Sequence, residues 1–420
     1  MRILLASWGS SGDLLPFLSL GRALRRRGHT VTLVGNPEWA ERGEQAGLRF
    51  VPAHVPLAVS PLEANPEIVS DANMGLTSFR ILVEKGIAPV LAETYATLER
   101  EAADHDLLVA HHFVFPAALI HEKTGIPWAT VCLAPGVTPS VHGLPAGNPL
   151  AAGSGLLWRL FHGMIWRIGT RLIEPILDPA LNRFRAEVGL PPARDHMFSA
   201  RSRELVLHLY SPHFAPRPAD WDSRHAVTGF CFHESVATLP PEVEDFLAAG
   251  PAPWLYTLGT TIVAHPRDFY REAAASVAGT GQRAILLTGN AENRPPALPP
   301  NVLAVDYLSH SAILPRCAAV AHQCGIGTLA SALRAGIPAV ACPFAFDQPN
   351  NAARARALGV AEIVPRKKRN AAGFRTAFEH LLSSPAPAKA RRLGAKIAAE
   401  DGPTRACETI EAIFNPHSSH

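Results

Sequence analysis

The sequence predicts an α/β protein whose two domains each contain a doubly wound parallel sheet. Short apolar runs alternate with helical segments in the first half of the chain, and the same alternation returns in the second half. The length of 420 residues is enough for two to three domains with cores of their own. With 47% hydrophobic and 18% charged residues, the composition excludes an intrinsically disordered chain.

The first half gives a regular alternation of strands and helices. Pro16 indicates the start of a helix and Gly28 its end, because proline is favoured in the first helical turn and glycine just after the last. The predicted strands are Arg2–Trp8, Thr30–Val34, Leu48–Val51, Leu107–Ala110 and Trp128–Leu133, and the predicted helices are Pro16–Arg27, Glu38–Ala46 and Phe115–Thr124. Strands separated by helices pair in parallel, so we expect ligand-binding residues at their carboxyl ends.

Six further apolar runs predict the second sheet: Trp254–Leu258, Ala284–Leu287, Val302–Val305, Ala318–Ala321, Ala339–Cys342 and Ala361–Val364. Prolines gather between the halves, in Ser211–Pro218 and around Pro240, as in stiff linkers. We therefore predict a first domain over residues 1–225, a second over 226–395, and a C-terminal helix within 396–420 that packs back on the first domain. A ligand cleft is expected between the carboxyl ends of the two sets of strands.

Charge and hydropathy exclude several classes of function. The net charge is only +3, and the short basic run Arg366–Arg369 is interpreted as a solvated loop, so nucleic acid is not an expected partner. No stretch of about 18 residues is free of charge and proline, so no membrane span is expected. The six cysteines form no CxxC pair, which predicts reduced thiols and a cytoplasmic protein.

Residues 155–177 form an amphipathic segment with two interpretations. Trp158, Phe161 and Trp166 stand among leucines and isoleucines, and arginines such as Arg159 interrupt them. Such a segment either lies on a membrane surface, which leaves peripheral membrane contact open, or packs on its own domain and lines an apolar pocket. The packing helix is the favoured interpretation. The sequence predicts no particular oligomeric state.

The most informative motif follows the predicted strand Ala318–Ala321. It reads His322-Gln323-Cys324-Gly325-Ile326-Gly327-Thr328 and leads into a helix. Backbone N–H groups and the dipole at a helix start favour a phosphate, to which Thr328 can add a hydroxyl and His322 an imidazole. A glycine turn with a capping threonine is the alternative.

Asp347-Gln348, beyond the next strand, favours the phosphate interpretation, because a carboxylate beside an amide can hold vicinal sugar hydroxyls. The stretch from His322 to Ala352 resembles the donor-sugar signature of the family 1 glycosyltransferases, which have the GT-B fold of two Rossmann-like domains facing a cleft. The resemblance implies that the first domain binds the acceptor and the second the nucleotide sugar. It also implies diphosphate contacts from His322, Gly325, Gly327 and Thr328, and sugar contacts from Asp347 and Gln348.

The N-terminal loop from Gly9 to Pro16 is similar to that of the sterol, glycopeptide and rhamnolipid branches of this family, and Trp221–Phe230 is similar to them as well. The overall run of motifs is most similar to the rhamnolipid rhamnosyltransferases. By this resemblance Asp13 is the catalytic base and Ser10 contacts the diphosphate. A carboxylate at this place can instead be a helix cap. The acceptor contacts expected from the first domain are His111, His112 and Phe113.

Thr260 and Tyr307 complete the expected donor site. Thr260 follows the first strand of the second domain, where it either reaches the β-phosphate or belongs to an ordinary turn. Tyr307, followed by Leu308, stands where the family stacks an aromatic ring on the nucleobase, and a core tyrosine is the equal alternative. Gln323 and Cys324 depart from the family, since they replace a histidine and a glycine, and this change can weaken the phosphate contact.

We expect an inverting glycosyltransferase that uses neither a metal nor another cofactor. Its donor is of the dTDP-rhamnose or UDP-glucose type, and its acceptor is a hydroxyl of an apolar small molecule or lipid. Asp104-His105-Asp106 spells the DxD of metal-dependent transferases but lies at a turn before a strand, and no cysteine or carboxylate complements His111 and His112 at ligand spacing. The alternative is a catalytically silent homologue that binds nucleotide or assists a partner enzyme.

Overall fold

The computed structural model describes residues 1–53, 75–148, 153–233 and 238–415. The chain divides into two compact units. Unit 1 contains Met1–Pro145, Ala152–His233 and Asp401–His420, and unit 2 contains Ala146–Ala151 and Glu234–Glu400. This division falls later than the predicted boundary at residue 225, because the proline-rich residues 211–218 lead into one more strand of the first sheet.

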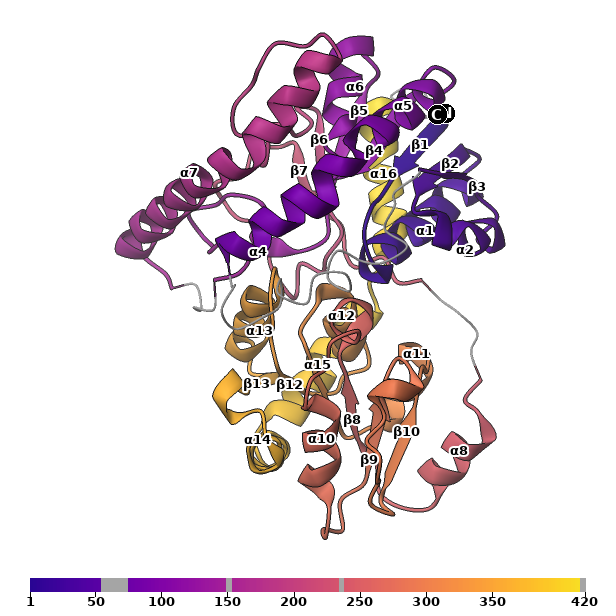
Figure 1. Cartoon of the computed structure of the whole chain (residues 1–420), viewed down its shortest axis with the longest axis vertical. Coiled ribbons are helices and arrows are strands. Elements are labelled where there is room, and N and C mark those ends of the chain that lie inside the picture. Colours follow the sequence, from indigo (N-terminus) through magenta and orange to yellow (C-terminus); the bar gives the residue numbers. More distant parts are fainter. Residues whose placement is uncertain (54–74, 149–152, 234–237, 416–420) are drawn as a thin grey trace. The chain divides into compact units, whose positions relative to one another are not determined.

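Unit 1 contains a seven-stranded sheet in the order β3-β2-β1-β4-β5-β6-β7, in which neighbouring strands pair in parallel (Figure 1). Its strands are β1 (Arg2–Ala6), β2 (Thr30–Gly35), β3 (Arg49–Pro52), β4 (Leu107–His111), β5 (Trp128–Cys132), β6 (Leu205–His208) and β7 (His225–Val227). The chain first builds outward from β1 to β3 and then returns to the other side of β1. The topological switch point of this sheet therefore lies between β1 and β4, which is where open α/β sheets bind ligands.

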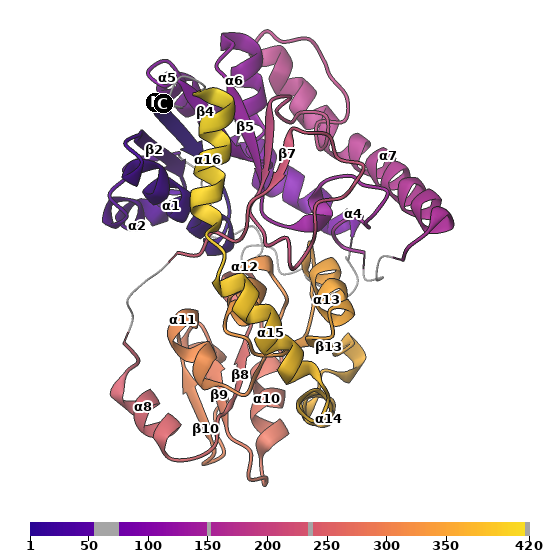
Figure 2. The ribbon, with the colours of Figure 1, turned by 180° about the vertical axis from the view of Figure 1, so that it is seen from behind.

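The helices of unit 1 follow their strands as βα units require. They are α1 (Ser11–Arg26), α2 (Ala40–Gln45), α4 (Leu76–Ile81), α5 (Leu91–Ala102), α6 (Pro116–Thr124), α7 (Leu156–Glu187) and α16 (Gly402–Phe414), with 3₁₀ turns at Pro37–Trp39, Ala88–Val90 and Pro135–Val137 and a π-helical stretch at Leu82–Ile87. The C-terminal helix α16 contacts α1, as the view from behind shows (Figure 2). There Glu411 of α16 accepts hydrogen bonds from Arg27 and lies 2.9 Å from His29 Nε2.

The start of α1 differs from the prediction. We expected the helix to begin at Pro16, whereas it begins at Ser11 and includes Pro16. Ser10 is the N-cap residue and Asp13 the third helical residue, and the two form a capping box. This box satisfies backbone N–H groups that would otherwise lack partners, so it sets the helix start one turn before the proline.

Helix α7 has two halves with different surroundings. Ile176, Leu177, Leu181 and Phe184 of its C-terminal half are buried in the main core cluster of unit 1. Most apolar residues of the N-terminal half are exposed. The predicted packing on its own domain therefore holds for the second half of the helix and not for most of the first.

Unit 2 contains a six-stranded parallel sheet in the order β10-β9-β8-β11-β12-β13. Its strands are β8 (Trp254–Thr257), β9 (Ala284–Leu287), β10 (Val302–Val305), β11 (Ala319–His322), β12 (Ala339–Ala341) and β13 (Ala361–Ile363). All of them coincide with predicted strands to within a few residues. Here the chain reverses direction between β8 and β11, so these two strands flank the switch point of unit 2.

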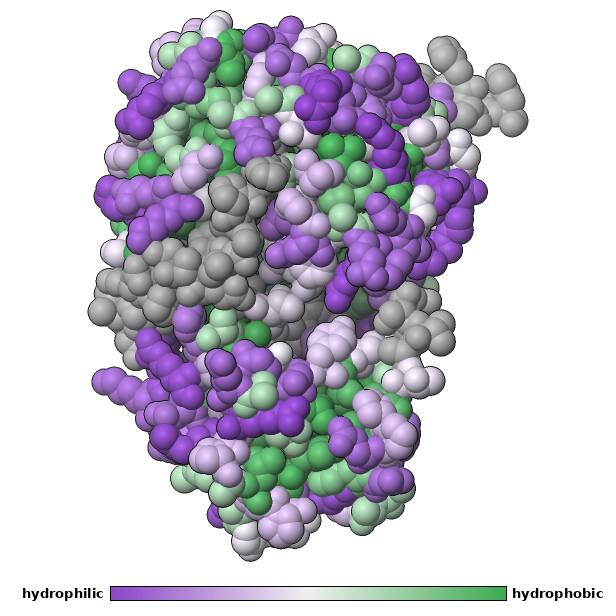
Figure 3. Space-filling view, turned by 45° about the vertical axis from the view of Figure 1, so that its right-hand side comes forward, coloured by the Kyte–Doolittle hydropathy of each residue, from purple (hydrophilic) through white to green (hydrophobic). Residues whose placement is uncertain are grey.

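The helices of unit 2 are α8 (Pro241–Ala248), α9 (Gly259–Ile262), α10 (Phe269–Val277), α11 (His310–Ile313), α12 (Ile326–Arg334), α13 (Gln348–Ala357), α14 (Ala371–Ser383) and α15 (Ala386–Ala398), with 3₁₀ turns at Ala291–Asn293, Leu314–Arg316 and Arg366–Lys368. Trp254 and Tyr256 of β8 pack against Phe378 of α14, with Trp254 stacked on its ring at 4.3 Å. Figure 3 shows hydrophilic and hydrophobic residues intermixed on one face of the protein. Within the described ranges, no helix has the length and apolarity that crossing a bilayer requires.

Candidate active site

The loop between β1 and α1 holds Asp13 at the switch point of unit 1. Its Oδ2 accepts hydrogen bonds from the backbone N of Ser10 at 2.9 Å and from Ser10 Oγ at 3.1 Å. Gly9, with φ of 111°, must be glycine, because a Cβ there would lie 2.4 Å from Asp13 Oδ2. Asp13 is thus a capping residue, and yet a third of its side chain is exposed. The cap and the base were predicted as alternatives, and this geometry is compatible with both.

His111, at the end of β4, lies beside the other oxygen of Asp13. The distance from His111 Nε2 to Asp13 Oδ1 is 3.9 Å, which is too long for a hydrogen bond. Burial lowers the pKa of His111 to about 3, and the positive charge of Arg201 contributes to the same shift. The imidazole is therefore neutral at physiological pH, so the pair is a carboxylate beside a neutral ring rather than a salt bridge.

His112 and Phe113 continue from His111 as a cluster of rings. The centroids of His111 and His112 lie 4.3 Å apart, and those of His112 and Phe113 lie 4.4 Å apart. Burial also lowers the pKa of His112 well below its usual value. Among the described residues, neither nitrogen of the His112 ring has a hydrogen-bond partner, and His111 Nδ1 has none either. The predicted acceptor residues therefore combine apolar ring faces with unsatisfied polar atoms, as a site for a hydroxylated apolar molecule requires.

At the switch point of unit 2, the loops after β8 and β11 meet through Gln323. The Nε2 of Gln323 lies so close to two glycines that an added Cβ would be 2.2 Å away at Gly259 and 3.0 Å away at Gly325. Gly259 also has φ of 61°, where glycine is favoured. Gln323 is buried, and its Oε1 has no hydrogen-bond partner in the part of the chain that the structure describes. The sequence marked Gln323 only as a departure from the family, but it joins the two loops expected to bind phosphate.

His322 and Cys324 fix the loop that opens α12. His322 Nδ1 accepts a hydrogen bond from the Cys324 backbone N at 3.0 Å, so in the neutral ring the proton is on Nε2. Burial lowers the pKa of His322 to about 3, which keeps the ring neutral. Its Nε2 is a buried donor that has no partner within the described ranges. His322 can therefore offer one N–H to a ligand but no positive charge.

Cys324 occupies the left-handed region, with φ of 65°, where glycine would carry no strain. This backbone conformation explains why the family has a glycine at this place, and this chain tolerates a cysteine there. The side chain is fully buried in a small cluster with Ala341 and Ala352. The thiol therefore packs into the core of unit 2.

Asp347 lies at the start of α13 and reaches the amides at the start of α12. Its carboxylate accepts a hydrogen bond from Asn351 Nδ2 at 2.7 Å and another from the backbone N–H of Ile326. Asn351 Nδ2 also donates to the carbonyl of Cys324 at 3.1 Å, which links the two loops. Burial raises the pKa of Asp347 to about 6 despite these hydrogen bonds. Asn351 was not predicted as a site residue, although it stands within the recognised motif.

Gln348 supports the loop before Asp347. Its Oε1 accepts hydrogen bonds from the backbone N of Phe344 and of Ala345, so only its amide N–H groups remain to bind a sugar. Arg366 and Arg369 donate to the carbonyls of Phe344 and Pro343. The basic run was predicted to be a solvated loop, and for these two arginines that prediction is wrong, because their guanidinium groups hold the loop that carries Asp347.

The remaining predicted donor residues follow the carboxyl ends of the same strands. Thr328 is buried in the first turn of α12, where the N-cap residue is Gly325 and the Ile326 N–H is bonded to Asp347. Thr260 is exposed in the short helix α9 rather than in a simple turn. Tyr307, which follows β10, is 69% exposed, so it is not a core tyrosine, whereas Leu308 is buried.

The Asp104-His105-Asp106 triplet has structural partners. Asp106 forms an ion pair with Arg2 at 2.8 Å, and His105 contacts the carbonyl of Glu101 and the hydroxyl of Thr32. Its side chains therefore support strand ends of unit 1. Across the residues with described positions, no group of three or more histidine, cysteine, aspartate or glutamate side chains is arranged to hold a metal ion.

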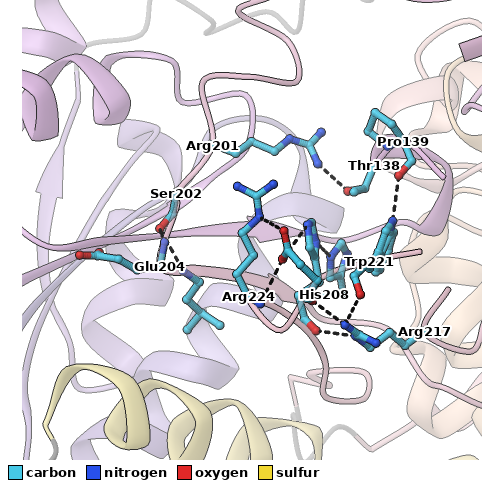
Figure 4. Close-up of polar contacts among 12 residues, drawn as sticks. Thr138, Pro139, Arg201, Ser202, Glu204, His208, Arg217, Trp221 and Arg224 are labelled. Atoms are coloured by element: carbon cyan, nitrogen blue, oxygen red, sulfur yellow. Dashed lines mark hydrogen bonds and ion pairs between the residues drawn. The ribbon is translucent and has the colours of Figure 1, made fainter. Parts of the chain in front are cut away.

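The contacts around β6 and β7 form a separate polar network (Figure 4). Trp221 Nε1 donates to the carbonyl of Pro139 at 2.8 Å, and the Trp221 ring stacks on His208 at 4.2 Å. Arg217 donates to the carbonyl of Trp221, and Arg201 to the Thr138 hydroxyl. A cavity of about 210 Å³ lies among Trp221, Arg201 and their neighbours. Trp221 and its partners therefore stabilise the edge of the unit 1 sheet at β6 and β7.

Two units that each hold a parallel α/β sheet with polar loops at its switch point are what the GT-B fold contains. A solved structure of spinosyn rhamnosyltransferase complexed with thymidine diphosphate has this fold, with a TM-score of 0.69 and 19% identity over 98% of this chain and 100% of that one. Residues 3–142 match the glycosyltransferase family 28 N-terminal domain, and residues 275–413 match the erythromycin biosynthesis protein CIII-like C-terminal domain.

Two curated relatives resolve the identity further. The chain is 36% identical to O-mycaminosyltylonolide 6-deoxyallosyltransferase of Streptomyces fradiae, over 98% of this chain and 97% of that protein. It is 31% identical to vancomycin aglycone glucosyltransferase of Amycolatopsis orientalis, over 86% of this chain and 85% of that protein. The chain belongs to the family 1 glycosyltransferases and is a glycosyl-transferring enzyme, as the sequence motifs predicted.

Proposed function

We propose that this enzyme transfers a sugar from a thymidine diphosphate donor to a hydroxyl of an apolar natural product, with inversion at the anomeric carbon and without a metal ion. The names of two relatives point to antibiotic-type acceptors, and one structural neighbour is a complex with thymidine diphosphate. UDP is the competing donor nucleotide. The observation that carries the proposal is the partly exposed carboxylate of Asp13 at a sheet switch point, next to the neutral ring of His111.

We assign the donor to unit 2. Asp347 occupies the backbone N–H of Ile326, and we assign the diphosphate to the N–H groups that follow it in the first turn of α12, where the helix dipole adds positive potential. His322 Nε2–H and the Gln323 amide supply two more donors, and Thr328 and Thr260 supply hydroxyls. We assign the sugar to Asp347 and to the N–H groups of Gln348, and the nucleobase to the exposed ring of Tyr307, which follows β10 on the same sheet edge.

We assign the acceptor and the base to unit 1. His112 and Phe113 offer ring faces to an apolar molecule, and unpartnered ring nitrogens of His111 and His112 can orient its hydroxyl. Asp13 is held through Oδ2 by the capping box, so it keeps a fixed position when Oδ1 takes a proton. Ser10, which we predicted as a diphosphate ligand, uses its hydroxyl in this box, so its assigned part in the reaction is to hold Asp13.

The reaction then follows in one displacement. The acceptor hydroxyl transfers its proton to Asp13, and its oxygen forms a bond to the anomeric carbon. The bond from that carbon to the diphosphate oxygen breaks, and the electron pair leaves with the diphosphate. N–H groups placed where this charge develops substitute for a metal ion. Attack on the face opposite the leaving group inverts the anomeric configuration.

The alternative of a catalytically silent homologue rested on Gln323 and Cys324. Cys324 packs into the hydrophobic cluster, and Gln323 brings an amide to the loops assigned to the diphosphate. Both observations favour a working donor site.

The six cysteines are all buried free thiols, which supports our proposal of a cytoplasmic site of action.

The test uses the full chain with dTDP-sugars and UDP-sugars, and with O-mycaminosyltylonolide and the vancomycin aglycone as acceptors. We expect release of thymidine diphosphate, a product heavier by one sugar in mass spectrometry, and an inverted anomeric centre by NMR. The variant is Asp13→Asn, and its matched control is Asp104→Asn, an exposed aspartate of the DxD-like triplet. Loss of transfer in the control, or its retention in Asp13→Asn, would contradict the assignment of the base.

A further inference from the structure

The N-terminal half of α7 exposes more large apolar side chains than any other helix within the described residues. They recur about every four residues, which places them along one side of a helix. Their exposed fractions are 71% for Leu156, 82% for Leu157, 64% for Leu160, 49% for Met164, 46% for Ile168 and 46% for Leu172. We call these residues the α7 stripe. Trp158, at 40% exposure, lies beside it.

The charges within the span of the α7 stripe are all positive. Arg159, Arg167 and Arg171 are exposed, and residues 155–173 contain no aspartate or glutamate. None of the three arginines has a hydrogen-bond or ion-pair partner in the described part of the chain. At about 100° per residue, Arg167 and Arg171 project within the arc spanned by the stripe rather than opposite to it.

We propose that the α7 stripe lies on a bilayer surface that contains anionic phospholipids. The apolar side chains would enter the acyl boundary, and the arginines would reach the phosphates above them, because long cationic side chains bury their stems and keep their charge in the headgroup layer. The stripe extends over about 25 Å of helix, which suits a helix lying flat on the surface.

The arginines favour a lipid surface over a protein partner. A dry protein interface over the stripe would bury Arg167 and Arg171, which have no carboxylate partner in the described part of the chain. Anionic headgroups provide phosphates at the height where these guanidinium groups end, without removing them from water. The C-terminal half of the helix is buried in the core through Leu177 and Leu181, so the exposed N-terminal half extends from a fixed part of unit 1.

The experiment is sedimentation of the full chain with vesicles of phosphatidylcholine alone or with about 30% phosphatidylglycerol, at low and high salt. We expect binding only to the anionic vesicles, and weaker binding at high salt. Leu157→Asp with Leu160→Asp should reduce vesicle affinity by about tenfold for each leucine. Arg167→Gln with Arg171→Gln should reduce it by about fivefold for each arginine.

The matched controls lie in unit 2 and should bind like the unchanged protein: Leu298→Asp, at 39% exposure, for the leucines, and Lys367→Gln for the arginines. Circular dichroism checks that each variant is folded, independently of any sugar transfer. Two results would overturn the proposal: no binding of the unchanged protein to anionic vesicles, or equal binding by the stripe variants. A third is a dimer in light scattering that Leu157→Asp with Leu160→Asp converts to a monomer, because a second copy would then cover the stripe.

Discussion

Asp13 combines a structural and a proposed chemical role, and two substitutions separate them. Asp13→Asn keeps an acceptor oxygen for the Ser10 N–H but removes the charge and the basicity, whereas Asp13→Ala removes the capping box as well. Loss of a negative charge in the first helical turn costs about 0.5 kcal/mol. Loss of the box adds about 1 kcal/mol. We therefore expect Asp13→Ala to lower the Tm by about 3–5 °C and Asp13→Asn by about 1–2 °C.

Turnover should fall by about 10²–10⁴-fold in both variants, because neither can accept the acceptor proton. Ser10→Ala is the matched control: it weakens the cap by about 1 kcal/mol but leaves the carboxylate, so most of the turnover should remain. The measurements are thermal unfolding and the rate of thymidine diphosphate release with a saturating acceptor. If Asp13→Asn keeps near-normal turnover while Asp13→Ala loses it, Asp13 acts only as a cap and the reasoning is refuted.

Three further predictions concern individual carboxylates and amides. Burial raises the pKa of Asp347 to about 6, so the ionised form of this side chain destabilises the fold above that pH. Asp347→Asn should therefore raise the free energy of unfolding at pH 8 by about 1 kcal/mol, and this gain should be lost near pH 4. The same substitution should slow sugar transfer. A gain that is the same at both pH values would refute this. Gln323→Glu should weaken thymidine diphosphate binding, measured by calorimetry, by more than tenfold, which is about 1.4 kcal/mol. Gln323→Ala should weaken it less, because only the glutamate adds a negative charge beside the diphosphate. Equal effects of the two substitutions would contradict the assigned contact. The hydrogen bonds from Arg27 and His29 lower the pKa of Glu411 to about 2. Glu411→Gln should therefore cost about 1–2 kcal/mol of stability at pH 7, and this cost should disappear as the pH falls from about 4.5 to 2. If chemical unfolding shows that the cost persists at low pH, the ionised Glu411 is not its source.

The sequence predicted most of the fold through apolar runs that end in glycine or polar residues. The two parallel, doubly wound sheets are confirmed. Strands β6 and β7 of the first sheet were not predicted. β7 has only three residues and follows a proline-rich region that is typical of a linker. The start of α1 was misplaced because Pro16 was taken as the first helical residue, although the Ser10–Asp13 capping box was visible in the sequence.

The sequence predicted the loops of the candidate site separately, but it did not predict which of them contact one another. The loops after β1, β8, β11 and β12 were each identified from their residue types. The approach of His111 to Asp13 depends on the pairing of β1 with β4, and the contact of Gln323 with Gly259 depends on the pairing of β8 with β11. Neither pairing follows from local sequence patterns, because β1 and β4, like β8 and β11, are neighbours in the sheet but are not consecutive strands along the chain.

The return of the chain to unit 1 through α16 limits how this enzyme can be recombined with relatives. A hybrid with a single crossover near residue 233 would bring a foreign terminal helix against α1. Arg27 and His29 would then face whatever residue the donor parent carries in place of Glu411. An exchange of sugar specificity therefore calls for two crossovers, the second near residue 400, so that the final helix stays with its own N-terminal half.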